Sequence, residues 1–156
     1  MTSDSGDKNK IDLVGNDFLL DDIEDLPSFV ALPSGAYVVT LDKGFEEKEI
    51  NDEPYFELAV TVQTVEELNE KLPEGESSPK PGDIGSFLFN RTNKFGMGNF
   101  KEIAKPIAQH FGSSTVGEVI DASKGLTVII IVKRTKGKDK NGNERYNSNL
   151  KKLEVI

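Results

Sequence analysis

The strictest alternation of apolar and polar residues in the chain is Tyr55-Phe56-Glu57-Leu58-Ala59-Val60-Thr61-Val62. Every second residue from Phe56 to Val62 is apolar, which predicts a β-strand with one face against a core. Four more stretches are predicted as strands: Ala36 to Asp42, Ile84 to Thr92, Leu126 to Arg134, and about Arg145 to Val155. The fourth strand, Leu126 to Arg134, is apolar on both faces at its centre, which predicts a strand covered on both sides. In the last strand the alternation slips near Lys151-Lys152, which predicts a β-bulge.

One helical region lies between the third and fourth predicted strands. Apolar residues recur at helical spacing from Phe100 to Phe111, and Gly112 can end the helix. Asn99 and Glu102 have the spacing of a capping box at its start. Pro106 interrupts the pattern, so we expect a kink or two short helices.

Two shorter segments complete the pattern. A further helical turn is predicted from Thr115 to Ile120, because Thr115 and Glu118 also have capping-box spacing. Residues 66–81 contain three prolines and several charges, which predicts an exposed loop. The start of that loop, Val65 to Leu68, is predicted to form a helical turn.

The resulting order is strand, strand, strand, helix, strand, strand. This is the order of the OB-fold, a mainly β, five-stranded Greek-key barrel with a helix between strands three and four. A two-layer α+β domain is the alternative. We expect the OB-fold domain to span residues 34–156, after an acidic and largely flexible N-terminal segment over residues 1–33.

Charge is distributed unevenly along the chain. Residues 1–79 contain 20 acidic and 5 basic side chains, whereas residues 80–156 contain 7 acidic and 14 basic ones. The net charge of −8 therefore combines an acidic first half with a basic second half. Such asymmetry is typical of a polyanion-binding surface joined to an acidic segment, although two ordinary solvated faces of opposite sign would give the same counts.

The composition narrows the classes of function. The 156 residues include no cysteine, which excludes thiolate chemistry, and only one histidine, His110, which excludes a metal centre built from several histidines. No apolar run is long enough to cross a bilayer and no secretory signal is apparent, so we expect no membrane association and a cytoplasmic location. We therefore expect a binding protein without cofactor or metal rather than an enzyme. The enzyme alternative is a metal-dependent nuclease that acts through scattered carboxylates. The carboxylates on the predicted strands, however, have no accompanying set of acidic or basic residues of the kind that an active site needs.

The most informative basic segment is Lys133 to Tyr146, which holds six basic and two acidic residues around an Asn-Gly turn. Asn-Gly favours a tight hairpin, and in OB-folds the hairpin between strands four and five flanks the nucleic-acid groove. A second basic stretch, Asn90 to Asn99, leaves the third strand. Single-strand binders need cations for the backbone and aromatic rings for the bases. The candidate nucleic-acid-binding residues are Tyr55, Phe89, Arg91, Lys94, Phe95, Lys133, Arg134, Lys136, Lys138, Lys140, Arg145 and Tyr146.

From about Gly35 to Val155, three-quarters of the chain, the sequence resembles bacteriophage-type single-stranded DNA-binding proteins of OB fold. The resemblance rests on the order of five motifs: Pro33-Ser34-Gly35-Ala36-Tyr37, Tyr55-Phe56-Glu57-Leu58, Phe100-Lys101-Glu102-Ile103, Gly125-Leu126-Thr127-Val128, and the basic hairpin Lys136 to Arg145. It implies non-specific coating of transient single strands in phage DNA replication, recombination or repair, in the host cytoplasm and without catalysis.

Such proteins usually carry an acidic C-terminal tail that recruits partner enzymes and competes with DNA. Here the end of the chain, Lys151 to Ile156, is not acidic, whereas Asp21 to Phe29 resembles that tail in composition. We hypothesise that this stretch binds replication or recombination proteins; packing on the barrel as an ordinary extension is the alternative. The candidate partner-binding residues are Asp21, Asp22, Glu24, Asp25 and Phe29.

The sequence thus predicts single-stranded DNA as the main partner. The alternative function is a protein-interaction or virion-assembly module that binds partners through the acidic N-terminal segment. Homo-oligomerisation is compatible with either.

Overall fold

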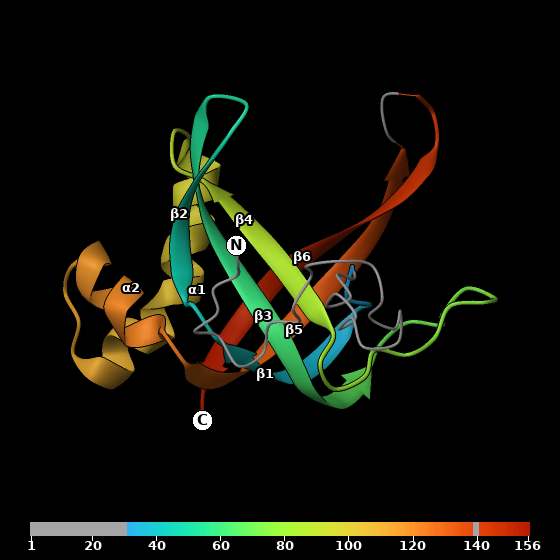
Figure 1. Cartoon of the computed structure of the whole chain (residues 1–156), viewed down its shortest axis with the longest axis horizontal. Coiled ribbons are helices and arrows are strands. Elements are labelled where there is room, and N and C mark those ends of the chain that lie inside the picture. The colour runs from blue at the N-terminus through green and yellow to red at the C-terminus, as the bar shows by residue number, and fades with distance from the viewer. Residues whose placement is uncertain (1–30, 139–140) are drawn as a thin grey trace, which may run out of the picture.

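One antiparallel six-stranded sheet and two helices form the part of the chain that the structure describes, residues 31–138 and 141–156 (Figure 1). The structure is a computed structural model. Its elements in chain order are β1 (Gly35–Leu41), β2 (Phe45–Ile50), β3 (Glu53–Leu68), β4 (Ile84–Asn90), α1 (Lys94–Phe111), α2 (Val116–Ser123), β5 (Leu126–Lys138) and β6 (Glu144–Val155). The protein is therefore mainly β, as predicted.

β3 organises the sheet. Its first residues pair with β2, its last residues pair with β1, and its other edge pairs with β4. β1 also pairs with β5, and β5 pairs with β6. Two register shifts between β1 and β3 bend the long strand, because a bulge adds a residue to one side of the ladder.

The sheet does not close into a barrel. β4 pairs with β3 and β6 pairs with β5, and among the described residues these two edges do not pair with each other. The chain around Leu32 lies between them: the Leu32 carbonyl accepts a hydrogen bond from Ser148 Oγ at 2.7 Å, while its side chain lies over Gly85. The sequence predicts a five-stranded barrel, whereas the structure has a six-stranded sheet that is not closed; the order of the predicted elements is retained.

The boundary of the folded part begins earlier than residue 34. Leu32 is completely buried and Pro33 is also buried. Both belong to the packed part of the chain, although the sequence assigned them to the N-terminal segment.

Several predicted elements have different bounds in the structure. Val65 to Leu68, predicted as a helical turn, continues β3 because β1 pairs with it. β2 was not predicted at all. It is joined to β3 by Asn51 and Asp52, whose φ angles of 50° and 64° are those of a tight two-residue hairpin turn.

α1 begins earlier than predicted. Asn93, not Asn99, is its N-cap, and the Asn93 side chain accepts a hydrogen bond from the Gly96 N–H at 2.6 Å. Gly96 and Gly98, in the basic stretch Asn90 to Asn99, lie inside this helix. At Gly96 a Cβ atom would lie 2.2 Å from the Asn90 carbonyl oxygen, so the glycine allows α1 to approach the end of β4.

Other helix predictions are confirmed. α1 ends at Gly112, which is in the left-handed conformation. The alternative of two short helices is wrong, because α1 continues through Pro106 as one helix. α2 begins with the predicted capping box of Thr115 and Glu118, and it extends to Ser123. The predicted bulge in the last strand is present, because the register skips Lys151 opposite Ile131 and Val132.

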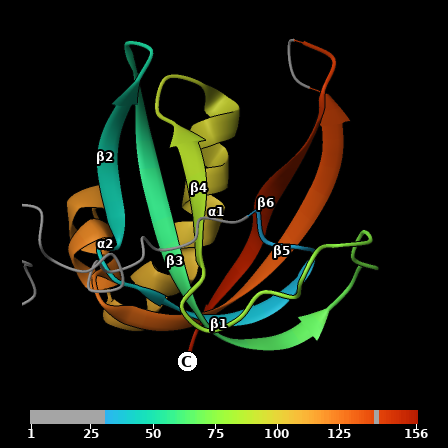
Figure 2. The same ribbon diagram turned by 45° about the vertical axis from the view of Figure 1, so that its right-hand side comes forward.

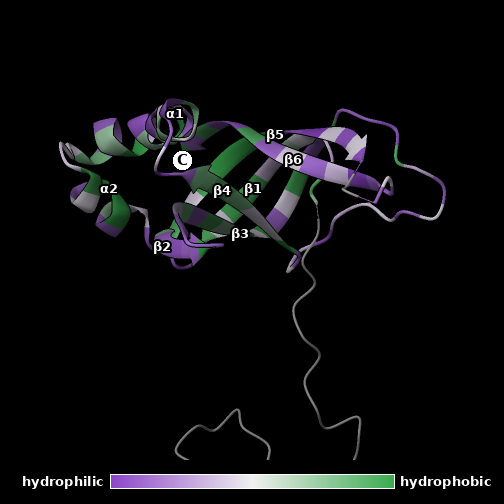
Figure 3. Cartoon of the chain, turned by 90° about the horizontal axis from the view of Figure 1, so that it is seen from above, coloured by the Kyte–Doolittle hydropathy of each residue, from purple (hydrophilic) through white to green (hydrophobic). Residues whose placement is uncertain are grey.

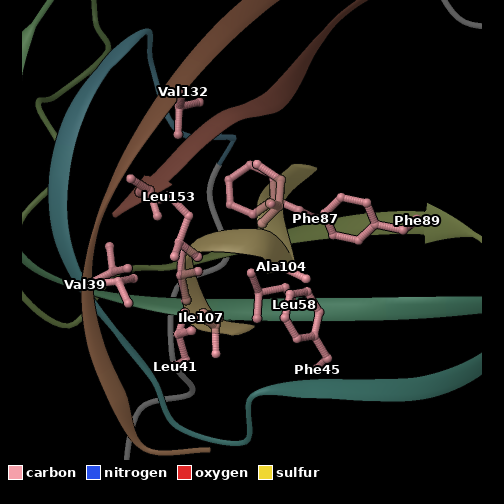
Figure 4. Packing of buried hydrophobic residues seen from close by; sticks show 14 of the residues in the cluster. Val39, Leu41, Phe45, Leu58, Phe87, Phe89, Ala104, Ile107, Val132 and Leu153 are labelled. Atoms are coloured by element: carbon pink, nitrogen blue, oxygen red, sulfur yellow. The ribbon is translucent and has the colours of Figure 1, made fainter. Parts of the chain in front are cut away.

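The core lies between the concave face of the sheet and α1, where side chains from both point toward one another (Figure 4). Inside it, Phe45, Phe56 and Phe89 surround Phe100 of α1, with ring centroids 4.6 to 6.0 Å from the Phe100 ring. β5 contributes Val128, Ile130 and Val132 to this core, but its Ile131 is 38% exposed on the other face. The expectation that β5 is covered on both sides is therefore wrong at Ile131.

Replacing Phe100 with alanine should lower the free energy of unfolding by about 3–5 kcal/mol, because it removes the ring at the centre of this aromatic cluster. The matched control is Phe95→Ala on the same helix, since Phe95 is 86% exposed and should contribute little. Chemical denaturation of the two variants measures the difference. Similar losses in both would contradict the packing described here.

Candidate nucleic-acid interface

Two hairpins project from the same side of the sheet, with β4 and α1 between them (Figures 1 and 2). The β2–β3 hairpin is acidic: residues 45–58 contain six acidic side chains and one lysine. The β5–β6 hairpin is basic, as predicted from its sequence. Figure 3 shows both hairpins as hydrophilic and the centre of the sheet as hydrophobic. The two arms thus carry opposite charge.

An open channel of about 870 Å³ lies between β4 and β6. Its walls come from β4, from the first half of α1 and from β6, and the segment Ala31–Leu32 contributes to it. The wall formed by β5 and β6 is polar and basic; the residues that line it are Thr135, Arg145, Tyr146, Asn147, Ser148, Asn149 and Lys151, together with the apolar Leu150. The opposite wall includes Ser86, Asn99 and Glu102. We call this groove the channel.

Tyr146 stands in the channel wall with one face covered. The guanidinium carbon of Arg134 lies 4.2 Å from the centroid of the Tyr146 ring. A cation over an aromatic face is attractive, and it restricts the orientation of the ring. Tyr146 is therefore held in place from behind, rather than being a freely rotating surface side chain.

Arg134 is itself fixed by hydrogen bonds from every N–H of its guanidinium group. Nε and Nη2 donate to the two carboxylate oxygens of Glu70 at 3.1 and 3.2 Å. Nη1 and Nη2 donate to those of Glu76 at 2.7 and 3.0 Å, and Nη1 also donates to the Ala31 carbonyl at 3.1 Å. The Arg134 side chain is only 2% exposed. We call Arg134, Glu70, Glu76 and Tyr146 the Arg134 cluster.

The electrostatics of this cluster favour its charged form. Hydrogen bonds to Glu76 and Glu70 raise the pKa of Arg134 further, so it remains protonated. Burial alone would raise the pKa of Glu70, but hydrogen bonds from the Ser34 N–H and from Arg134 outweigh it and bring this pKa below its ordinary value. One arginine facing two carboxylates gives the cluster a formal charge of −1.

The structure separates the predicted cations. Arg134 is buried and bonded to two carboxylates, so it is not available to phosphates, and the prediction for Arg134 is wrong. Arg91 lies with the acidic hairpin: its Nη1 is 2.8 Å from Glu47 Oε1, and its guanidinium lies 4.4 Å from the Phe56 ring centroid. The predicted cations therefore do not all remain available at the β5–β6 hairpin.

Along β5 and β6 the remaining cations divide between the two faces. Lys136 lies opposite Tyr146 in the ladder, whereas Arg145 lies opposite Gly137 and thus on the other face. Lys133 shares the face of Arg145. Lys136 is 3.0 Å from Glu144, and the hydrogen bond to this carboxylate raises the pKa of Lys136. Lys138 is exposed.

The predicted aromatic residues have different surroundings. Phe89 is 5% exposed and belongs to the core, so we remove it from the candidate stacking residues. Tyr55 is partly exposed on the outer face of β3. Phe95 is largely exposed at the start of α1, next to Lys94 and to Gly96 of the channel wall. Lys140, Asp21, Asp22, Glu24, Asp25 and Phe29 lie outside the described residues.

Sequence reasoning missed the polar residues of the channel, above all Asn99, Asn147 and Asn149. The sequence shows the alternation of apolar and polar residues in β6, but alternation does not indicate which edge of a strand remains unpaired. Lys151 was also not predicted as a site residue, although the predicted bulge could have drawn attention to it.

Two other kinds of feature are absent from the described residues. In the part of the chain that the structure describes, no three acidic or histidine side chains gather where they could hold a metal ion. None of the described helices combines the length and apolar character that a membrane crossing requires.

Replacing Glu70 with glutamine should reduce the acid sensitivity of the fold. The folded-state pKa of Glu70 lies below its ordinary value of 4.5, so its stabilising effect is present above that value and is lost as the pH falls through the folded-state value. The free energy of unfolding of E70Q should be lower than that of the unaltered protein at pH 7, and the two should converge as the pH falls through the folded-state pKa of Glu70.

The control is Glu74→Gln, which removes the same charge from an exposed position of the same loop. Denaturation at a series of pH values should give E74Q the acid dependence of the unaltered protein. If E70Q and E74Q behave alike, Glu70 does not contribute through the Arg134 cluster.

No family model matches this chain, and no curated protein matches it in sequence.

Proposed function

We propose that this protein binds single-stranded DNA without sequence preference, in the channel between β4 and β6. Three features support the proposal: an open groove, a basic wall and a fixed aromatic ring. Non-specific binding of single strands requires a cationic groove along the backbone and aromatic faces on which bases stack. The channel offers the basic Arg145 and Lys151, and Tyr146 is fixed by Arg134.

The arrangement of strands also supports an OB-fold. β1 and β2 follow one another along the same edge of β3 and act as one interrupted strand. Counted in this way, five strands surround the core, with α1 between the third and the fourth. OB-folds are partly open barrels that bind oligonucleotides on the second and third strands, between the first and last hairpins. Those strands correspond here to β3 and β4, next to the channel.

The observation that carries the proposal is the state of the channel cations. Arg145 and Lys151 form no ion pair within the described residues, whereas Arg91, Arg134 and Lys136 all face carboxylates. An unpaired cation beside a groove can neutralise a phosphate without first breaking an internal bond. The proposed phosphate contacts are therefore Arg145 and Lys151, with Lys94, Lys133 and Lys138 as exposed neighbours, and Tyr146 and Phe95 as stacking residues.

The protein should bind a labelled oligo-dT more tightly than a duplex of equal length, with an affinity that falls steeply as salt is added. Each phosphate contact on a single strand contributes about −0.7 to the slope of log K against log salt, so three or more contacts give a slope steeper than about −2. Fluorescence anisotropy at several salt concentrations measures it. A shallower slope, or a preference for duplex, would count against the proposal.

Two substitutions separate charge from stacking. Arg145→Gln should make the salt slope shallower by about 0.7, because one phosphate contact is lost. Phe95→Ala should leave the slope unchanged and weaken binding by about 1–3 kcal/mol, the usual contribution of one stacked base. Salt titrations of both variants against the same oligo-dT measure the two effects.

Lys43→Gln is the control for charge, since Lys43 is exposed between β1 and β2 and does not line the channel. It should bind as the unaltered protein does. A loss of slope in K43Q equal to that in R145Q would mean that net charge, not the channel, determines affinity.

A second candidate function is the capture of an extended peptide. The edges of β4 and β6 that face the channel pair with no other strand among the described residues, and such edges can accept an added strand through backbone hydrogen bonds. A peptide bound in this way does not need Arg145. Two results would favour this function: the protein does not bind oligo-dT, and the R145Q variant binds an extended peptide as tightly as the unaltered protein does.

A further inference from the structure

A second groove, of about 720 Å³, lies between the outer side of α1 and the end of β6. α1 contributes Lys105, Gln109 and His110 to its walls, and β6 contributes Lys151, Lys152 and Glu154. Apart from Lys151, its residues have no part in the function proposed above. We call it the second groove.

The second groove is lined by more charged residues than the channel, but both have a net formal charge of +1. Three lysines and two acidic residues, Glu102 and Glu154, line it, whereas Arg145, Lys151 and one carboxylate line the channel. Lys152 is 2.9 Å from Glu154 and is therefore partly neutralised. Lys105 and Lys151 form no ion pair with any described residue, so both charges are open to an anion.

The two grooves meet at shared residues. Glu102 and Lys151 line both of them, from α1 and from β6 respectively. Lys151 is the extra residue of the β6 bulge, where the ladder passes from Lys152 directly to Leu150. A bulge redirects the side chain of its extra residue away from the regular alternation, and here it puts a lysine where one groove passes into the other.

We propose that a single strand of DNA bound in the channel continues past Lys151 into the second groove, where Lys105 and Lys151 neutralise its phosphates. This inference rests on the proposed function and extends it: the binding site is longer than the channel, and α1 contributes to it beyond its first turns. A strand too short to pass Lys151 uses the channel alone. A longer strand gains contacts from the second groove.

The test compares two lengths of oligo-dT, about 6 and about 16 nucleotides, which span the usual range of site sizes for one OB-fold. Lys105→Gln should bind the short oligonucleotide as the unaltered protein does. For the long one, its affinity should fall severalfold and its salt slope should become shallower by about 0.7. Anisotropy titrations at several salt concentrations give both quantities.

The matched control is Lys101→Gln, one turn earlier on α1, because Lys101 is exposed and lines neither groove. It should bind both lengths as the unaltered protein does. Equal behaviour of K105Q and K101Q on the long oligonucleotide would overturn the extension and leave the channel proposal standing. If the unaltered protein binds neither length, the proposed function itself fails, and the extension fails with it.

Discussion

The hydrogen bonding of Arg134 is the interaction on which the rest of the structure most depends. A buried guanidinium is costly unless each of its donors is satisfied, and here Glu70, Glu76 and the Ala31 carbonyl satisfy all five. These partners come from the segment before β1 and from the loop after β3, and the ring of Tyr146 comes from β6. One side chain thus joins four parts of the chain that are distant in sequence.

The same cluster explains how an acidic protein can present a basic wall. Glu70 and Glu76 belong to the acidic first half of the sequence, but their charge is directed inward at Arg134 and not toward the channel. The acidic β2–β3 hairpin in turn binds Arg91 through Glu47. Internal pairing therefore removes Arg91 and Arg134 from the candidate interface, and Lys136 is paired with Glu144 as well. It leaves Arg145 and Lys151 as the channel cations that no described carboxylate neutralises.

Local pattern predicted much of the fold, and the failures have physical causes. The alternation around Phe56 predicts β3, and the capping box at Thr115 predicts α2. Each of these signals comes from residues that are close to one another in the sequence. β2 has the sequence Phe-Glu-Glu-Lys-Glu-Ile and shows no alternation, since its charged residues face solvent at the edge of a hairpin. The start of α1 was misplaced because Gly96 serves close packing against Asn90, whereas in sequence it resembles a loop residue.

The candidate site was less predictable than the fold. Arg134 lies among lysines in a basic run and looks like them in sequence, but its partners Glu70 and Glu76 are 64 and 58 residues away. No local pattern reports such a distance. Which face of the hairpin each lysine takes depends on the register of β5 and β6, and the bulge at Lys151 changes that register. Charge composition could therefore indicate a polyanion-binding surface without identifying the cations that form it.

The unpaired edges of β4 and β6 need protection from pairing with other chains, whatever the protein binds. Lysines and bulges on an edge strand prevent such pairing, so Lys151 and the asparagines of β6 can be explained as protection alone. Protection, however, requires only that charge be present along the edge. It does not require an open groove beside that edge, nor a tyrosine held from behind by a buried arginine. The proposed function accounts for both features, because an aromatic ring that lines the channel and is held by Arg134 can stack on a nucleic-acid base.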